Sequence, residues 1–183
     1  MRNILIVSNF LTIGGGEKLI YELCLFAKEN NINVTVLILD NYNIEYYDPI
    51  LTKMNVKIVR TRIKNIKHLR APVKMIKSAY WVILLKYFAN KTFSSVHIIG
   101  LYNLDKVYDK INHNHRLFWN INNAEQFSEG IYPISGEYLR NSNDKVVCIN
   151  KYQVEEIYTQ YERGNVETEL LQFKLFLKEN DEY

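Results

Sequence analysis

The sequence predicts an α/β fold: a Rossmann-like open parallel sheet with helices on both faces. Continuous apolar runs, such as residues 4–7 and 36–39, are typical of parallel strands that are buried on both faces. Segments with apolar residues at helical spacing alternate with these runs, as right-handed crossover connections between parallel strands require. The 183 residues are 48% hydrophobic with only 7 Gly and 3 Pro, which excludes a disordered, collagen-like or low-complexity chain.

In the first half of the chain, the apolar run at residues 3–8 predicts a strand, and a loop with three glycines follows it. Residues 17–28 carry apolar side chains at helical spacing, and the Asn-Asn pair after them predicts the end of that helix. Residues 33–40 predict a second buried strand, and residues 54–59 a shorter third one. A helix is expected at residues 72–90, because a proline at its start suits the first turn.

In the second half, residues 95–100, 116–121 and 145–149 read as strands because each is a short apolar run. Residues 104–111 and 152–161 are expected to be helical. Strands and helices therefore continue to alternate, and no linker rich in Gly, Pro or Ser interrupts them.

We expect one Rossmann-like domain over residues 1–163. Residues 166–177 fit a strand or a helix equally well, so residues 164–183 are expected to be a terminal strand, a helix or a linker.

The composition suggests a cytoplasmic protein. The apolar run at residues 81–85 is far shorter than the ~20 residues of a membrane-spanning helix, and the N-terminal residues do not resemble a signal peptide. Cys24 and Cys148 lie in separate apolar surroundings and are expected to be reduced core residues. No cluster of Cys and His suggests a metal site, so none is expected.

The charges are distributed unevenly. Residues 49–104 contain eleven Lys and Arg and no acidic residue, which favours an anionic partner such as a phosphate or a lipid headgroup. Nucleic acid is not expected, because the rest of the chain is acidic and offers no stacking platform.

The helix expected at residues 72–90 suggests where that partner binds. One helical face is expected to face the core and consists of Val73, Ile76, Tyr80, Ile83, Leu84 and Tyr87. The opposite, outer face consists of Lys74, Lys77, Ser78, Trp81, Leu85 and Phe88. The opposite face would then meet an anionic membrane surface, which implies a protein bound peripherally on the inner face of the cell membrane. The alternative is a helix buried on both sides with solvated lysines. The expected membrane-surface residues are Lys67, Arg70, Lys74, Lys77 and Trp81.

The glycine loop Gly14-Gly15-Gly16-Glu17-Lys18 connects the first strand to the first helix. Ligands of open parallel sheets bind beyond the carboxyl ends of the strands, and a helix start attracts anions. A phosphate or diphosphate is the expected ligand, and a tight turn without a ligand is the alternative. The spacing fits neither a dinucleotide fingerprint nor a P-loop.

Several segments together resemble a known family. The order I-L-I-V-S, G-G-G-E-K, L-I-Y-E-L and V-T-V-L-I-L-D looks like the start of glycosyltransferase family 4. Residues 118–125 are similar to that family's aromatic strand, and residues 145–161 to its later strand-and-helix unit. The resemblance spans about residues 3–163 and implies the N-terminal, acceptor-side half of a two-domain GT-B architecture.

The resemblance also implies roles for particular residues. Asn122 stands where the family commonly has a histidine at the reacting centre, so it and Glu125 are the implied catalytic residues. Asn9 and Asn123 would line the acceptor cleft. The implied site for the donor diphosphate consists of Gly14, Gly15, Gly16 and Lys18.

The resemblance implies transfer of a sugar from a nucleotide-diphosphate donor to a glycan or lipid-linked acceptor, as in surface polysaccharide biosynthesis. The nucleotide sugar is a substrate, and no cofactor or metal is implied. The family's C-terminal donor-binding domain has no counterpart here, so this chain alone is expected to be inactive without such a domain or subunit. One alternative is a non-catalytic subunit that docks on a membrane and recruits a donor-binding chain. Another is a cofactor-binding module that uses Asp40 at the end of the second strand.

Overall fold

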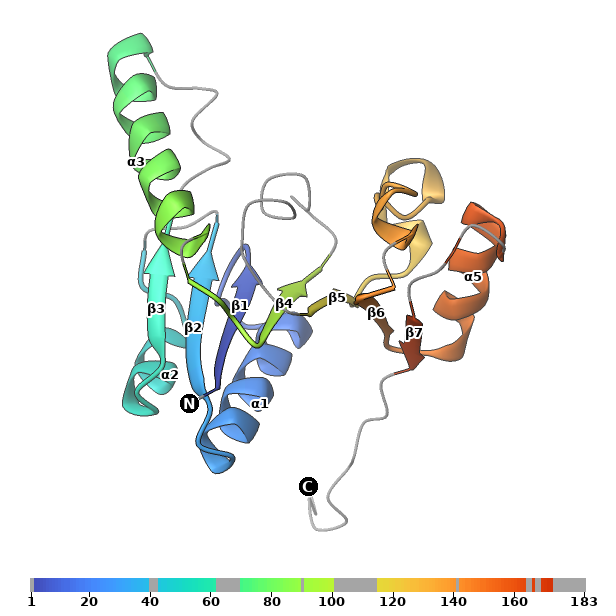
Figure 1. Ribbon diagram of the computed structural model, residues 1–183, viewed down its shortest axis with the longest axis horizontal. Helices are drawn as coiled ribbons and strands as arrows, with labels where there is room; N and C mark the ends of the chain where they lie inside the picture. Colours follow the sequence, from blue (N-terminus) through green and yellow to red (C-terminus); the bar gives the residue numbers. More distant parts are fainter. Residues whose placement is uncertain are drawn as a thin grey trace.

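The computed structural model describes residues 2–39, 43–61, 70–89, 91–100, 115–140, 142–163, 166 and 169–172. Within these residues, seven strands form one parallel sheet in the order β3-β2-β1-β4-β5-β6-β7 (Figure 1). The predicted fold class is therefore confirmed. The expected helix at residues 104–111, Asp40 and Lys67 lie outside the described residues.

The strands are β1 (Asn3–Ser8), β2 (Asn33–Ile38), β3 (Lys57–Arg60), β4 (Ser95–Ile99), β5 (Arg116–Asn120), β6 (Asp144–Cys148) and β7 (Glu169–Gln172). The helices are α1 (Gly15–Glu29), α2 (Asp48–Lys53), α3 (Ala71–Ala89) and α5 (Lys151–Tyr161), with short 3-10 helices η3 (Ala124–Gln126), η4 (Ser128–Gly130) and η5 (Tyr138–Arg140).

The expected elements within the described residues are present, with boundaries shifted by a few residues. Helix α2 was not predicted, because a six-residue helix has too few turns to show a periodic pattern. The ambiguous segment after residue 166 contains β7, which joins the same sheet, so the sheet continues past residue 163. The 3-10 helices after β5 were also not predicted.

The sheet separates two hydrophobic clusters. On one face, Ile20 and Cys24 of α1 and Leu51 of α2 pack against Ile6 of β1 and its neighbours. On the other face, Phe88 of α3 and Ile157 of α5 pack against Leu5, Val7 and their neighbours. Helices thus cover both faces, as predicted, and the alternating residues of β1 serve both cores. This is why β1 has a continuous apolar run.

Cys24 and Cys148 are both buried and unpaired, as expected. Burial raises the pKa of each thiol to about 12, with a smaller contribution from Glu156 at Cys148. Both side chains therefore contribute to the core as small apolar groups.

The predicted orientation of α3 is wrong. Ile76 and Ile83, expected in the core, are 70% and 66% exposed. Phe88, expected on the outer face, is buried, and Trp81 packs against the core cluster beside it. Nearly the whole circumference of α3 is apolar, so the sequence pattern did not determine which side packs inward.

Candidate functional site

The strand order reverses between β1 and β4. The chain leaves β1 for β2 and β3 on one side and then returns to β4 on the other side. In open α/β sheets, such a reversal of the strand order forms a crevice at the carboxyl edge of the sheet. Open α/β sheets bind their ligands at such a switch point, which makes this edge the first place to look for a site.

A pocket of about 250 Å³ lies at this switch point. It is formed by the residues that directly follow β1, β4 and β5 together with the first turn of α1. The lining residues are Ser8, Asn9, Phe10, Gly16, Glu17, Ile99, Gly100 and Ile121. We call this cavity the switch pocket. Of the predicted site residues, Asn9 and Gly16 line it.

Two glycines of the switch pocket lie in constrained positions. A Cβ on Gly16 would lie 2.7 Å from Ile121 Cδ1 and 3.6 Å from Ile99 Cγ2, so the end of the Ile121 side chain would have to shift to make room for it. Gly100 has a φ of 76°, in the left-handed region, and its N–H donates to the Trp119 carbonyl at 2.9 Å.

Gly15 is less constrained than Gly14 and Gly16. A Cβ on Gly15 would have nothing within 4 Å, so this position is open. Gly14 is extended, a conformation that any residue adopts, and a Cβ there would contact the Glu17 carboxylate. The loop is therefore open at Gly15, while Gly14 lies beside the negative side chain of Glu17.

The start of α1 is electrostatically suited to an anion. No side chain caps this helix, and the first intrahelical bond is the Lys18 N–H to the Gly14 carbonyl, at 2.9 Å. The preceding N–H groups of the first turn and the positive end of the helix dipole therefore face the loop. The carboxylate of Glu17 lies in this field and would compete with a bound anion. The Lys18 side chain is exposed and does not line the switch pocket.

The other predicted site residues lie in the segment that follows β5. The Asn122 amide donates to Gln126 Oε1 at 3.0 Å, and the Asn123 side chain forms a capping box with Gln126 around η3. Glu125 is exposed on the first turn of η3. Asn122 directly follows Ile121, a lining residue at the rim of the switch pocket, but Asn122, Asn123 and Glu125 do not themselves line the pocket.

Helix α5 holds this segment in place, a role that the sequence analysis missed. The buried Gln153 donates from Nε2 to the Asn122 carbonyl at 3.1 Å and to Asn123 Oδ1 at 3.3 Å. Its own Oε1 accepts from the Ile149 N–H at 2.9 Å. Gln160 makes two further bonds to the backbone of Tyr132. A buried glutamine on a helix gives no distinctive sequence signal, because its partners are distant in the chain.

A buried polar group lies deeper in the same region. Asn120, at the end of β5, is fully buried next to the Tyr132 hydroxyl, and neither of its amide atoms makes a hydrogen bond of ordinary geometry. Burial and the hydrogen bond to Glu156 raise the pKa of Tyr132, so its hydroxyl remains protonated and donates to Glu156.

The predicted membrane-surface residues are split between two environments. Arg70 and Lys74 are exposed, while Lys77 and Trp81 are partly buried on the inner side of α3.

No helix in the described ranges is both long and apolar enough to cross a membrane. Among the same residues, no group of three or more His, Cys, Asp and Glu side chains could hold a metal ion.

Comparisons with known proteins do not assign this chain. No protein-family model matches it, and no curated protein sequence matches it significantly. The resemblance to glycosyltransferase family 4 therefore rests on the sequence motifs and their order.

Proposed function

We propose that the chain is the acceptor-side half of a glycosyltransferase that moves a sugar from a nucleotide-diphosphate donor to a glycan or lipid-linked acceptor. The observation that carries the proposal is the position of the glycine loop. The loop borders the switch pocket, where the uncapped first turn of α1 meets the ends of β1, β4 and β5. Backbone N–H groups and the helix dipole would stabilise the negative charge that develops on the diphosphate as the sugar leaves.

In this proposal the polar side chains in and near the switch pocket bind and orient hydroxyl groups. Asn9 would hydrogen-bond a hydroxyl of the sugar or the acceptor, because it lies in the switch pocket itself. Asn122, Asn123 and Glu125 would act at the rim. Asn122 can orient a hydroxyl but does not exchange a proton near neutral pH. A separate domain or subunit would hold the nucleotide.

Diphosphate binding at the glycine loop tests the first step. We expect Gly15→Asp to abolish pyrophosphate binding, because its carboxylate would enter the open space at the helix start. We expect Glu17→Gln to strengthen binding, since it removes the competing charge. Gly15→Ala is the matched control for added volume. Pyrophosphate titration followed by calorimetry gives the affinities, and equal affinities for all four proteins would contradict the role of the loop.

Sugar transfer tests the second step. The chain is combined with its donor-binding domain or subunit and assayed with a set of nucleotide-diphosphate sugars. We expect Gly15→Asp to reduce transfer strongly and Gly15→Ala to leave it close to the wild type. Gly15 is more informative than Gly16, because a side chain at Gly16 would disturb the packing against Ile121. Transfer that survives Gly15→Asp would exclude the loop from catalysis.

One observation favours a second function, membrane docking through α3. The amino-terminal part of α3 rises beyond the ends of β1, β2 and β3 (Figure 1). It exposes large apolar side chains, and α3 carries no acidic residue. Apolar groups with lysines around them suit the interface of an anionic bilayer. The exposed apolar residues of α3 are Val73, Met75, Ile76, Tyr80, Val82, Ile83 and Tyr87.

Co-sedimentation with vesicles of graded phosphatidylglycerol content tests membrane docking. Ile76→Glu/Ile83→Glu should abolish binding, because both side chains are exposed and their replacement leaves the core intact. Phe26→Glu is the matched control, since Phe26 is an exposed apolar residue of α1, on the opposite face of the sheet. If the double variant binds vesicles as well as the control does, α3 is not the docking element.

A further inference from the structure

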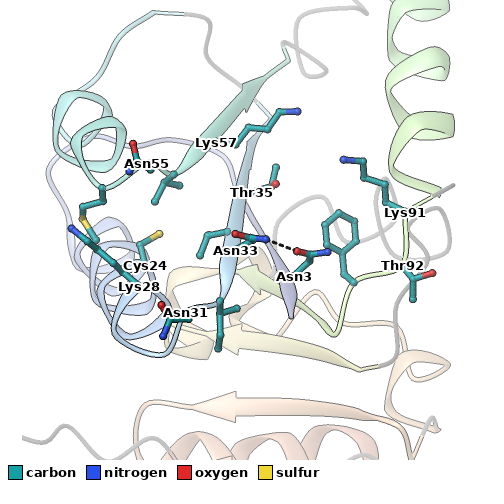
Figure 2. A pocket seen from close by; sticks show the side chains of 15 residues that line it. Asn3, Cys24, Lys28, Asn31, Asn33, Thr35, Asn55, Lys57, Lys91 and Thr92 are labelled. Atoms are coloured by element: carbon teal, nitrogen blue, oxygen red, sulfur yellow. Dashed lines mark hydrogen bonds between the residues drawn. The ribbon is translucent and has the colours of Figure 1, made fainter. Parts of the chain in front are cut away.

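A second and larger cavity lies at the amino end of the sheet, the edge opposite to the switch pocket. Its volume is about 610 Å³, within the range of small-molecule sites. The starts of β1, β2 and β3 and the segment before β4 line it (Figure 2). Its fifteen lining residues include three lysines, four asparagines and no carboxylate. We call this cavity the amino-end basin.

One wall of the basin is a row of polar side chains across three neighbouring strands. Asn3 of β1 is paired in register with Asn33 of β2, and Thr35 of β2 with Lys57 of β3. Alternate residues of a strand point to the same face, so Asn33 and Thr35 share the face that carries α3. Asn33 Nδ2 donates to Asn3 Oδ1 at 3.0 Å, which aligns the two amides. Phe93 also lines the basin.

Two lysines converge above this wall. Lys57 and Lys91 extend toward one another beside Thr35 (Figure 2). Lys57 Nζ donates to the Tyr87 hydroxyl at 3.1 Å, and the Nζ atoms of Lys57 and Lys91 lie 5.3 and 4.5 Å from the centroid of the Tyr87 ring. The hydrogen bonds from the two ammonium groups lower the pKa of Tyr87.

Neither ammonium group has an acidic partner within the described part of the chain. The paired cations elsewhere contrast with them: Arg60 meets Glu45 and Asp48, and Arg116 meets Asp144. Two like charges on one phenol repel each other, and an anion placed between them would relieve that repulsion.

We propose that the amino-end basin binds a soluble phosphate monoester with a hydroxylated carrier, of the size of a sugar phosphate. Lys57 and Lys91 would hold the phosphoryl oxygens by charge-assisted hydrogen bonds. Asn3, Asn33 and Thr35 would hydrogen-bond the carrier's hydroxyl groups. The amide and hydroxyl groups beside the two lysines suit a carrier of this kind. This site is separate from the glycine loop.

Residue-resolved NMR titration tests the proposal. The folded chain is titrated with glucose 6-phosphate, inorganic phosphate and glucose at constant ionic strength. We expect glucose 6-phosphate to shift the amide signals of Asn33, Thr35 and Lys57 with saturation, inorganic phosphate to do so more weakly, and glucose to have no effect. The same shifts should persist in Gly15→Asp, which separates the basin from phosphate binding at the glycine loop.

Matched charge variants complete the test. Lys57→Gln/Lys91→Gln should weaken binding by about tenfold or more, because two charge-assisted hydrogen bonds are lost. Lys53→Gln, on α2 outside the basin, should change it less than about twofold. Equal weakening in both proteins, or no saturable shift at the basin in the wild type, would overturn the proposal. Shifts there that only phosphatidic acid vesicles produce would assign the lysines to a lipid headgroup and overturn it too.

Discussion

His97 should make the stability of this protein sensitive to acid. The side chain lies on β4, where its Nδ1 accepts from Trp119 Nε1 at 3.2 Å and its Nε2 lies 3.0 Å from Ser95 Oγ. Because Nδ1 accepts, the neutral ring carries its proton on Nε2 and donates it to Ser95. Burial lowers the pKa of His97 from 6.5 to about 4. The folded protein therefore keeps this imidazole neutral at pH values where the unfolded chain protonates it.

The sign and size of the effect follow from proton linkage. Above pH 6.5 the ring is neutral in both states, and the full stability is present. As the pH falls from 6.5 toward 4, only the unfolded chain gains a proton, so the free energy of unfolding decreases; below the folded pKa the loss levels off. A difference of 2.5 between the two pKa values corresponds to a loss of about 3 kcal/mol.

Urea unfolding of the wild type and His97→Phe between pH 8 and pH 4 measures this contribution. The variant keeps a ring against Trp119 but cannot titrate, and its lost hydrogen bonds lower stability equally at every pH. We expect the acid-induced loss in the variant to be smaller than in the wild type by about 3 kcal/mol. His115→Gln is the control, because His115 is exposed. Identical acid-induced losses in the wild type and His97→Phe would refute the reasoning.

Two further predictions concern packing and charge. Asp144→Asn should lower the free energy of unfolding by about 3–5 kcal/mol, because it leaves the buried Arg116 guanidinium without the carboxylate that it contacts at 2.9 Å. Arg116→Met/Asp144→Leu should lower it clearly less, since no buried charge is left. Equal losses in the two variants, measured by chemical denaturation, would contradict this account. Gly16→Ala should be less stable than Gly15→Ala by about 1–3 kcal/mol, and Ile121→Val should recover much of that difference in the same measurement, since it removes the clashing methyl group.

The fold class could be predicted from the sequence because it depends on local patterns. A run such as residues 4–7 is apolar at every position, which only a strand buried on both faces explains. The sequence signal for the end of α1 is also local. Asn30 caps the helix, and Asn31 adopts the left-handed conformation that asparagine tolerates. These signals need no knowledge of distant residues.

The candidate site could be predicted only in part. The glycine loop was predicted as a candidate site because parallel sheets bind ligands after their strands. The sequence did not show that Gly15 has open space around it whereas Gly16 packs against Ile121. Ile121 reaches Gly16 only after β1, β4 and β5 are placed side by side. Gln153 was missed for the same reason, since its partners follow β5.

Tertiary structure alone decided which side of α3 faces outward and which charges lie together. The apolar residues of α3 lie on nearly all sides of the helix. Whether Trp81 and Phe88 or Ile76 is buried therefore depends on the shape of the sheet against which the helix packs. Lys57 and Lys91 are far apart in the chain, and both ammonium groups lie next to the Tyr87 side chain in the folded protein. The sequence by itself determined six of the seven strands, the longer helices and the place of the glycine loop, because hydrophobic periodicity and turn preferences act over a few residues. The pockets depended on strand order, which brings distant segments together.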